Sequence, residues 1–288
     1  MVNATGNGGL ITVFVKNSRA VFLIFPSATS NQDFKIFMNI TLLTNRDLAS
    51  HIALGRLIEG LADHQLSIFL SEKVGADHSL PQPLMDLTAF EKELLNDGRA
   101  SFDQLAQRAG CSVQGFVDLN NQVNSVKGIA RIAATEPDLI ISLRFGLIIR
   151  EPIIALPKFG VINLHSGVLP AYRGVMATFR AMQNHDSEIG STLHFIQDGG
   201  IDNGDIISIE RIPLQREKSY LLNVLNLYTA GCQQILQVVG ELACGQVINR
   251  QPQQGVAGYY SFPDQAELDT FSAGGSLLFN RAEISALN

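Results

Sequence analysis

The fold of this chain is decided by the stretch MNITLLT, residues 38–44, which indicates the opening strand of an α/β domain. From residue 38 onward, strand patterns and helix patterns alternate along the chain. This alternation is typical of a parallel sheet covered by helices on both faces. We therefore predict an α/β fold with a Rossmann-like, mostly parallel sheet and helices on both faces. The predicted strands are residues 40–43, 66–70, 139–143, 161–164, 192–196 and 206–211, and the predicted helices are residues 47–61, 84–95, 102–109, 123–134, 175–184 and 220–242.

The segment before residue 38 differs in character from the rest of the chain, because residues 27–33 are polar and rich in turn-forming types. We interpret residues 1–37 as an N-terminal extension outside the fold, and an additional hairpin on the sheet edge is the alternative. Residues 38–250 are predicted to form the catalytic domain. Residues 251–288 are predicted to form a short C-terminal tail or lid.

Composition narrows the classes of function. The chain has 288 residues, of which 46% are hydrophobic and 17% charged, as in an ordinary soluble globular protein. Its net charge of −6 and the lack of a Lys and Arg cluster argue against nucleic acid as a partner. The three scattered cysteines form neither a disulfide framework nor a metal signature, so we expect a cytoplasmic protein with no bound metal. The apolar stretch of residues 9–26 is interrupted by polar residues, so no membrane segment is predicted.

The turn after the first strand excludes one common use of this fold. A dinucleotide or nucleotide site needs a glycine-rich turn there, so that backbone amides can hold phosphate. Residues 44–47 read TNRD and contain no glycine. We therefore expect neither NAD, FAD nor Walker-type ATP binding.

The polar residues of chemical interest follow later, in GVINLHSGVLP (residues 160–170) and DGGIDNG (residues 198–204). Asn163 and His165 are two positions apart on a predicted strand, so their side chains point to the same side. The Asn163 amide can donate a hydrogen bond to a carbonyl oxygen that becomes an oxyanion, and His165 can donate or accept a proton. Asp202 can orient the imidazole or relay a proton. Ser166 faces away from His165, so direct attack by a bound amine is favoured over an acyl-enzyme.

Each of these residues also has a purely structural interpretation. An isolated Asn-x-His is more often a strand-end turn with a buried histidine satisfied by the backbone, and Asp-Asn-Gly is a common turn signal. His194 is interpreted as a strand residue at the wall of the cleft.

The order of several motifs distinguishes the two interpretations. These motifs are SLRFGLII (residues 142–149), LPKFGVINLH (156–165), LPAYRG (169–174), TLHFI (192–196) and IDNG (201–204). In this order and spacing they resemble the folate-dependent formyltransferase family. The resemblance includes small-molecule or sugar N-formyltransferases and the catalytic domain of methionyl-tRNA formyltransferase.

The resemblance implies transfer of a formyl group from 10-formyltetrahydrofolate to the amine of a small molecule. By position, Asn163 and His165 would stabilise the tetrahedral oxyanion, and Asp202 would assist proton transfer, with Asp198 as the alternative acid. The pterin of the donor would lie between residues 145–149 and residues 198–202 and contact mainly backbone groups. The implied donor-binding residues are Phe145, Leu147, Ile149, Asp198, Gly199 and Ile201.

The acceptor is less well defined by the sequence. A glycinamide ribonucleotide acceptor would require the missing glycine-rich loop, and a tRNA acceptor would require a sizeable C-terminal domain. We therefore expect a small-molecule amine as the partner, no nucleic acid and no membrane, and a homodimer is one assembly the chain could form. Two alternatives remain open: a hydrolase that passes the formyl group to water, and a non-catalytic folate-binding relative.

Overall fold

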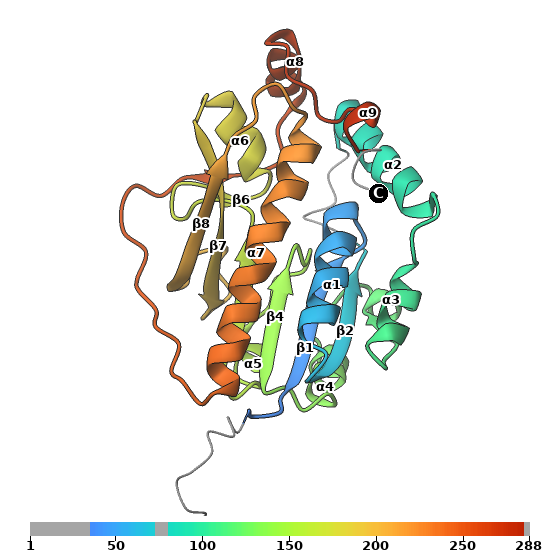
Figure 1. Cartoon of the computed structure of the whole chain (residues 1–288), viewed down its shortest axis with the longest axis vertical. Coiled ribbons are helices and arrows are strands. Elements are labelled where there is room, and N and C mark those ends of the chain that lie inside the picture. The colour runs from blue at the N-terminus through green and yellow to red at the C-terminus, as the bar shows by residue number, and fades with distance from the viewer. Residues whose placement is uncertain (1–34, 73–79, 285–288) are drawn as a thin grey trace, which may run out of the picture. The chain divides into compact units, whose positions relative to one another are not determined.

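The strands of one twisted sheet organise the molecule, in a computed structural model that describes residues 35–72 and 80–284. Within these residues, seven strands lie in the order β3-β2-β1-β4-β5-β7-β8. Figure 1 labels β2, β1, β4, β7 and β8 of this sheet. Strands β1 to β5 of this sheet run parallel, whereas β7 is antiparallel to β5 and β8 is antiparallel to β7. The bounds are β1 (Asn39–Asn45), β2 (Gln65–Ser71), β3 (Val113–Gly115), β4 (Leu139–Leu143), β5 (Val161–His165), β7 (Glu188–Ile196) and β8 (Ile206–Pro213).

The first strand is buried on both faces, as its apolar sequence requires. Ile40 and Leu42 belong to the larger hydrophobic core, and Leu43 belongs to a smaller core on the other face of the sheet. Ile40 pairs with Leu66 of β2 on one side and with Leu139 of β4 on the other. A parallel strand between two parallel neighbours must be apolar on both faces, because helices cover both.

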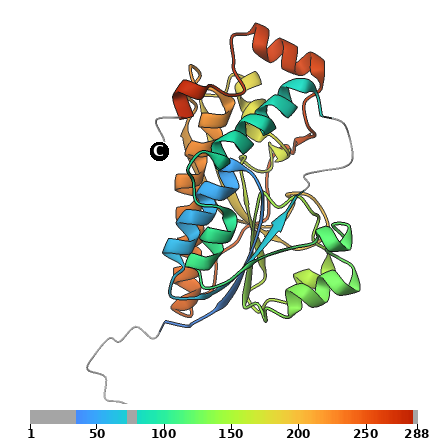
Figure 2. The ribbon, with the colours of Figure 1, turned by 90° about the vertical axis from the view of Figure 1, so that its right-hand side faces the viewer.

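Two long helices cover one face of the sheet and two shorter ones cover the other. Helices α1 (Leu48–Gly60) and α7 (Tyr220–Ala243) pack side by side on the larger core (Figures 1 and 2). Helices α4 (Val126–Ala133) and α5 (Glu151–Ile154) lie on the opposite face, against the smaller core. The remaining helices are α2 (Gln82–Asn96), α3 (Phe102–Arg108), α6 (Ala177–Gln183), α8 (Gln265–Ala273), α9 (Arg281–Ile284) and a short 3-10 helix (Val117–Leu119).

Side chains at the helix starts fix where these helices begin. The Asp47 carboxylate accepts a hydrogen bond from the Ser50 amide at 2.8 Å, at the first turn of α1. Ser219 caps α7 in the same way through the Leu222 amide. Such caps satisfy amides that have no partner inside the helix.

A second, two-stranded sheet joins distant parts of the chain. Strand β6 (Arg173–Gly174) pairs in parallel with β9 (Tyr259–Tyr260). Gly174 has a φ of 95°, and a Cβ atom there would lie 2.1 Å from the carbonyl oxygen of Tyr260. Glycine is therefore required for the close approach of these two strands.

The predicted fold class is confirmed: the sheet is mostly parallel and helices lie on both faces. The predicted strand at residues 192–196 was wrong at its start, because β7 already begins at Glu188. The short strands β3, β6 and β9 and helix α8 were not predicted. Of the predicted N-terminal extension, residues 1–34 lie outside the described residues. None of the described helices is long and apolar enough to cross a membrane.

Leu164 offers a test of the packing beneath β5. Its side chain is 2% exposed and lies against α7, where a Cβ atom on Gly231 would be 2.9 Å from Leu164 Cδ2. We expect Leu164→Ala to lower the free energy of unfolding by about 2–5 kcal/mol in urea denaturation, because it leaves a cavity between strand and helix. Val247→Ala, at a side chain that is 93% exposed, is the control and should stay within about 0.5 kcal/mol of wild type. An equally small loss for both variants would contradict this packing.

Candidate active site

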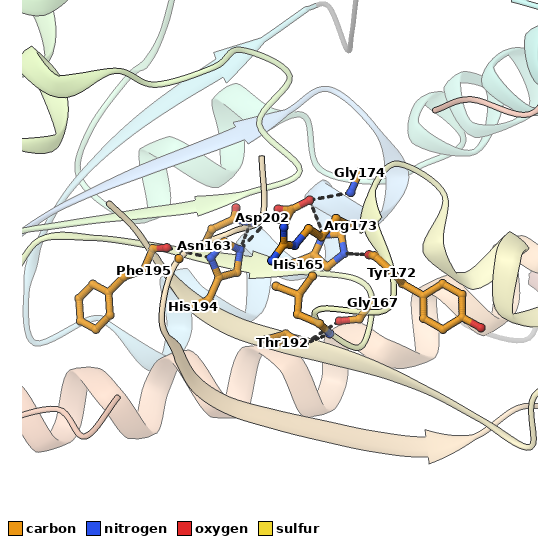
Figure 3. Close-up of polar contacts among 12 residues, drawn as sticks. Asn163, His165, Gly167, Tyr172, Arg173, Gly174, Thr192, His194, Phe195 and Asp202 are labelled. Carbon is orange, nitrogen blue, oxygen red and sulfur yellow. Dashed lines mark hydrogen bonds and ion pairs between the residues drawn. The ribbon is translucent and has the colours of Figure 1, made fainter. Parts of the chain in front are cut away.

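Strand β5 and its antiparallel neighbour β7 bring four polar side chains together at the sheet. In their register Asn163 lies opposite His194, and His165 lies opposite Thr192. Asn163 Nδ2 is 3.1 Å from His194 Nε2 (Figure 3). Residues opposite each other on antiparallel strands project from the same face, so this pairing follows from the register.

Asp202 lies between the two histidines. One carboxylate oxygen, Oδ2, is 3.4 Å from His165 Nδ1, and the other, Oδ1, is 3.5 Å from His194 Nε2 (Figure 3). The amide of Gly174 donates to Oδ2 at 2.9 Å. Asn163, His165 and Asp202 are therefore brought together by the fold. His194, which was predicted only as a strand residue at the wall of the cleft, lies with them.

Backbone carbonyls determine which imidazole nitrogens carry protons. His165 Nε2 is 2.6 Å from the carbonyl oxygen of Tyr172, and His194 Nδ1 is 2.9 Å from that of Phe195. A carbonyl oxygen can only accept, so both of these nitrogens are donors. When the His194 ring is neutral, its Nε2 accepts from Asn163, and when the ring is protonated, Nε2 faces the Asp202 carboxylate as a donor. His165 Nδ1 is likewise the ring nitrogen that faces Asp202.

The Asp202 carboxyl is strongly acidic in this setting. Its side chain is only 11% exposed, and burial raises its pKa, but the charge of His165 and the hydrogen bond and charge of His194 outweigh burial. With a further contribution from the Gly174 amide, the pKa falls from 3.8 to about 2. Asp202 is therefore a carboxylate at neutral pH and faces His165 as an anion.

Asp198, the alternative acid predicted from the sequence, is directed into its own loop. Its Oδ1 accepts from the Gly200 amide at 2.7 Å and from Asn203 Nδ2 at 3.1 Å. Its side chain is exposed, and its described contacts include neither histidine. The geometry thus favours Asp202 over Asp198 as the partner of His165.

The two segments that the resemblance assigned to the folate donor lie next to each other. A Cβ atom on Gly199 would lie 3.7 Å from Arg150 Cγ, so the loop after β4 lies close to the loop before Asp202. Phe145 packs against Phe116 at 6.3 Å between ring centroids. Ile149 is buried in the smaller core, whereas Ile201 is exposed.

One side chain, that of Asn124, binds two backbone groups of the loop after β4. Asn124 binds the carbonyl of Ile148 at 2.7 Å and the amide of Arg150 at 2.9 Å. Within the described ranges, no hydrogen bond engages the backbone of Leu147 or Ile149. These two residues can offer their backbone groups to a ligand, because peptide groups left unpaired by the protein need another partner.

A separate cavity lies behind the turn that follows His165. It has a volume of about 230 Å³, and residues 166–168, Thr178 and Arg211 contribute to its wall. None of Asn163, His165 and Asp202 lines it. The candidate site itself is formed by side chains and loops at the strand ends rather than by this cavity. Among the described residues, no group of three or more His, Cys, Asp or Glu is arranged to hold a metal ion.

Comparison with protein families finds a match for the segment that contains these residues. Residues 106–222, which include β4, β5, β7 and the Asp202 loop, match the family model for formyl transferase. The match covers less than half of the chain and shows a similarity to this family. Methionyl-tRNA formyltransferase from Ralstonia pickettii is 30% identical over 157 residues, which cover 54% of this chain and 48% of the relative. The enzyme of the same name from Syntrophomonas wolfei is 32% identical over 168 residues, covering 58% of this chain and 52% of the relative. The chain thus spans about half the length of these curated relatives.

Solved structures of formyl transferases share the fold. Glycinamide ribonucleotide transformylase 1 from Symbiobacterium toebii is 17% identical with a TM-score of 0.57, covering 79% of this chain and 100% of its own. An N-formyltransferase from Helicobacter canadensis, in complex with folinic acid and dTDP-3-aminofucose, is 17% identical with a TM-score of 0.53. That match covers 78% of this chain and 71% of the other. At this level of identity the likeness concerns the fold.

The lowered pKa of Asp202 predicts a pH-dependent contribution to stability. A carboxyl whose pKa is lower in the folded state stabilises the protein above its unfolded pKa, here 3.8, and the gain is lost as the pH falls toward 2. We expect the difference in free energy of unfolding between wild type and Asp202→Asn to shrink by about 1 kcal/mol from pH 5 to pH 3. Urea denaturation at both pH values measures it. Asp202 has a φ of 49°, which asparagine also tolerates, so the backbone preference is retained. A difference that is constant over this range would show that the histidines do not hold the carboxylate.

Proposed function

We propose that this chain transfers a formyl group from 10-formyltetrahydrofolate to the amine of a small molecule. The observation that carries the proposal is the contact of Asp202 with both His165 and His194, beside Asn163, inside the segment that matches the formyl transferase family. This arrangement combines amide donors, an imidazole and a carboxylate, which together can stabilise an oxyanion and move a proton.

The reaction forms a bond between the acceptor nitrogen and the formyl carbon, and breaks the bond between that carbon and N10 of the folate. A proton leaves the acceptor nitrogen and a proton is delivered to N10, so the sum is neutral. Charge builds up on the formyl oxygen when the nitrogen attacks. Preorganised donors aimed at this oxygen lower the barrier, because they need not reorient as the charge develops.

Asn163 is suited to the oxyanion. Its amide nitrogen has two hydrogens, and the contact with His194 Nε2 uses only one of them. The second hydrogen is available for the formyl oxygen. His194 therefore fixes the direction of the Asn163 amide in this proposal.

His165 and Asp202 are suited to the proton. The Tyr172 carbonyl holds His165 Nε2 as a donor, so protonation occurs at Nδ1, 3.4 Å from the Asp202 carboxylate. A proton on Nδ1 would place positive charge beside the oxyanion, and the carboxylate would stabilise that charge. Asp202, as an anion, can also accept a proton from the attacking amine through a water molecule.

The folate donor is assigned to the loops at residues 145–149 and 198–201. The support is that Gly199 lies close to Arg150, at the end of the first loop, and that the backbone groups of Leu147 and Ile149 are unpaired within the described residues. A pterin ring offers several donors and acceptors along its edge, and such groups can pair with backbone amides and carbonyls in an apolar pocket. The folinic acid in the fold relative from Helicobacter canadensis is consistent with a folate at this fold.

The acceptor in this proposal is a small-molecule amine. A net charge of −6 disfavours a polyanionic acceptor such as tRNA, and the turn after β1 lacks the glycines of a phosphate loop. An amino sugar on a nucleotide carrier, as in the complex with dTDP-3-aminofucose, is one member of this class. The similarity to methionyl-tRNA formyltransferases requires that the tRNA acceptor be tested alongside.

The decisive assay incubates the protein with 10-formyltetrahydrofolate and a panel of amines, including nucleotide-linked amino sugars, free amino acids and methionyl-tRNA. We expect tetrahydrofolate release that depends on one small amine, with a formylated product detected by mass spectrometry. Release of formate without any amine would establish a hydrolase instead. Formylation of methionyl-tRNA would overturn the small-molecule acceptor, and folate binding without turnover would show a non-catalytic relative.

Asn163→Ala tests the oxyanion role directly. We expect its transition-state stabilisation to fall by about 2.7–4 kcal/mol, a loss of roughly 100- to 1,000-fold in kcat, because one oxyanion donor is removed. Binding of the folate should remain close to wild type. The control is Asn96→Ala, at an exposed position on α2, which should keep full activity. Near-wild-type turnover of Asn163→Ala would reject this mechanism.

A further inference from the structure

The segment after α7 returns along the sheet and crosses the loop that carries Asp202. We call residues Gln251–Tyr260 the C-terminal strap. At its start, Gln251 and Ile206 exchange two backbone hydrogen bonds of 2.8 Å at the beginning of β8. At its end, the Arg173 amide donates to the carbonyl of Gly258 at 2.9 Å. The strap is thus anchored on both sides of the candidate active site.

One side chain in the middle of the strap points inward. Gln253 is partly buried, whereas residues 251–252 and 254–257 are exposed. Its Nε2 donates to the carbonyl of Asp202 at 2.8 Å and to the carbonyl of Gly204 at 2.9 Å. Its Oε1 accepts from Arg173 Nη2 at 2.7 Å and from Arg173 Nε at 3.2 Å.

The polarity of these contacts fixes the orientation of the Gln253 amide. Both carbonyls can only accept and the guanidinium of Arg173 can only donate, so the NH2 group must face Asp202 and Gly204. A flipped amide would place donors against donors and acceptors against acceptors. Every hydrogen-bonding group of the side chain is therefore matched in one orientation.

The partners of Gln253 belong to two segments, residues 202–204 and β6, and both segments position the Asp202 carboxylate. One is the backbone of Asp202 itself. The other is Arg173, whose neighbour Gly174 donates its amide to Asp202 Oδ2 at 2.9 Å. Gln253 thus connects the Asp202 peptide group with strand β6, whose Gly174 amide donates to the Asp202 carboxylate.

The Asp202 backbone needs such support. Its φ is 49°, in the left-handed region that favours glycine and that Asp and Asn adopt more readily than other residues with a side chain. The loop is also tightly closed, because a Cβ atom at Gly204 would lie 1.9 Å from the carbonyl oxygen of Phe195. Strained backbone of this kind persists only where its surroundings hold it.

We propose that Gln253 is a positioning residue that holds the Asp202 carboxylate between His165 and His194. Its hydrogen bonds go to Arg173, Asp202 and Gly204, none of which is among the residues assigned to the folate donor, so it acts through the Asp202 backbone and through Arg173. The inference rests on the proposed function for its kinetic consequence, whereas its structural consequence can be measured without any substrate.

The test compares Gln253→Met with Gln254→Met. Methionine has nearly the volume of glutamine but cannot form the four hydrogen bonds, and Gln254 is the exposed neighbour of the same residue type. We expect Gln253→Met to lower kcat roughly 10- to 100-fold with the KM for the folate donor within about twofold of wild type, because misplacing a catalytic group by about 1 Å costs rate. Gln254→Met should match wild type in both constants.

A second measurement is independent of turnover. The imidazole ¹⁵N resonances of His165 and His194, assigned with His165→Asn and His194→Asn, are recorded at pH 7 without ligand. We expect Gln253→Met to shift both resonances in the direction seen for Asp202→Asn, while Gln254→Met leaves them in place. Circular dichroism verifies that both methionine variants keep the fold.

These outcomes distinguish the positioning role of Gln253 from the proposed formyl transfer. Unchanged imidazole resonances in a folded Gln253→Met variant would overturn the positioning role, whatever the activity. Shifted resonances in a protein that transfers no formyl group to any acceptor would support the positioning role and reject the proposed function. A loss of kcat in Gln253→Met that is matched by Gln254→Met would also contradict the inference.

Discussion

The antiparallel register between β5 and β7 is the constraint on which the candidate site depends. The other strands of the sheet as far as β5 are parallel, so the direction changes at this point. The pairing of Asn163 with His194 puts an amide and an imidazole side by side, and a shift of one residue would turn His194 to the opposite face. Leu164, between the two site residues of β5, faces the core and holds the strand in this register.

Electrostatic interactions then determine the protonation state of Asp202. A carboxylate that is almost fully buried normally favours its neutral form, yet Asp202 has a pKa of about 2 because two imidazoles and one amide surround it. Carbonyl oxygens of Tyr172 and Phe195 orient these imidazoles from behind. The backbone therefore decides the tautomers, and the tautomers decide which nitrogen faces the carboxylate.

Local sequence was sufficient for some of these features and insufficient for others. The apolar run before Asn45 predicted β1, and alternation in β5 predicted that Asn163 and His165 project together. The part played by His194 depends on strand pairing 31 residues away, which periodicity does not encode. Gln253 is still harder to predict, since the residues QPQQG show no regular pattern and only the tertiary course of the strap makes one glutamine different from its neighbours.

The C-terminal strap has a consequence for modularity. The segment that matches the formyl transferase family ends at residue 222, whereas Gln253 and Tyr260, which contact Asp202 and Val175, lie beyond it. The recognisable segment and the physically complete site are thus different parts of the chain. A chimaera that transplanted residues 106–222 alone into another scaffold would carry Asn163, His165 and Asp202 but would lose the hydrogen bonds from Gln253 to the Asp202 backbone. A segment exchanged between relatives therefore has to include the C-terminal strap.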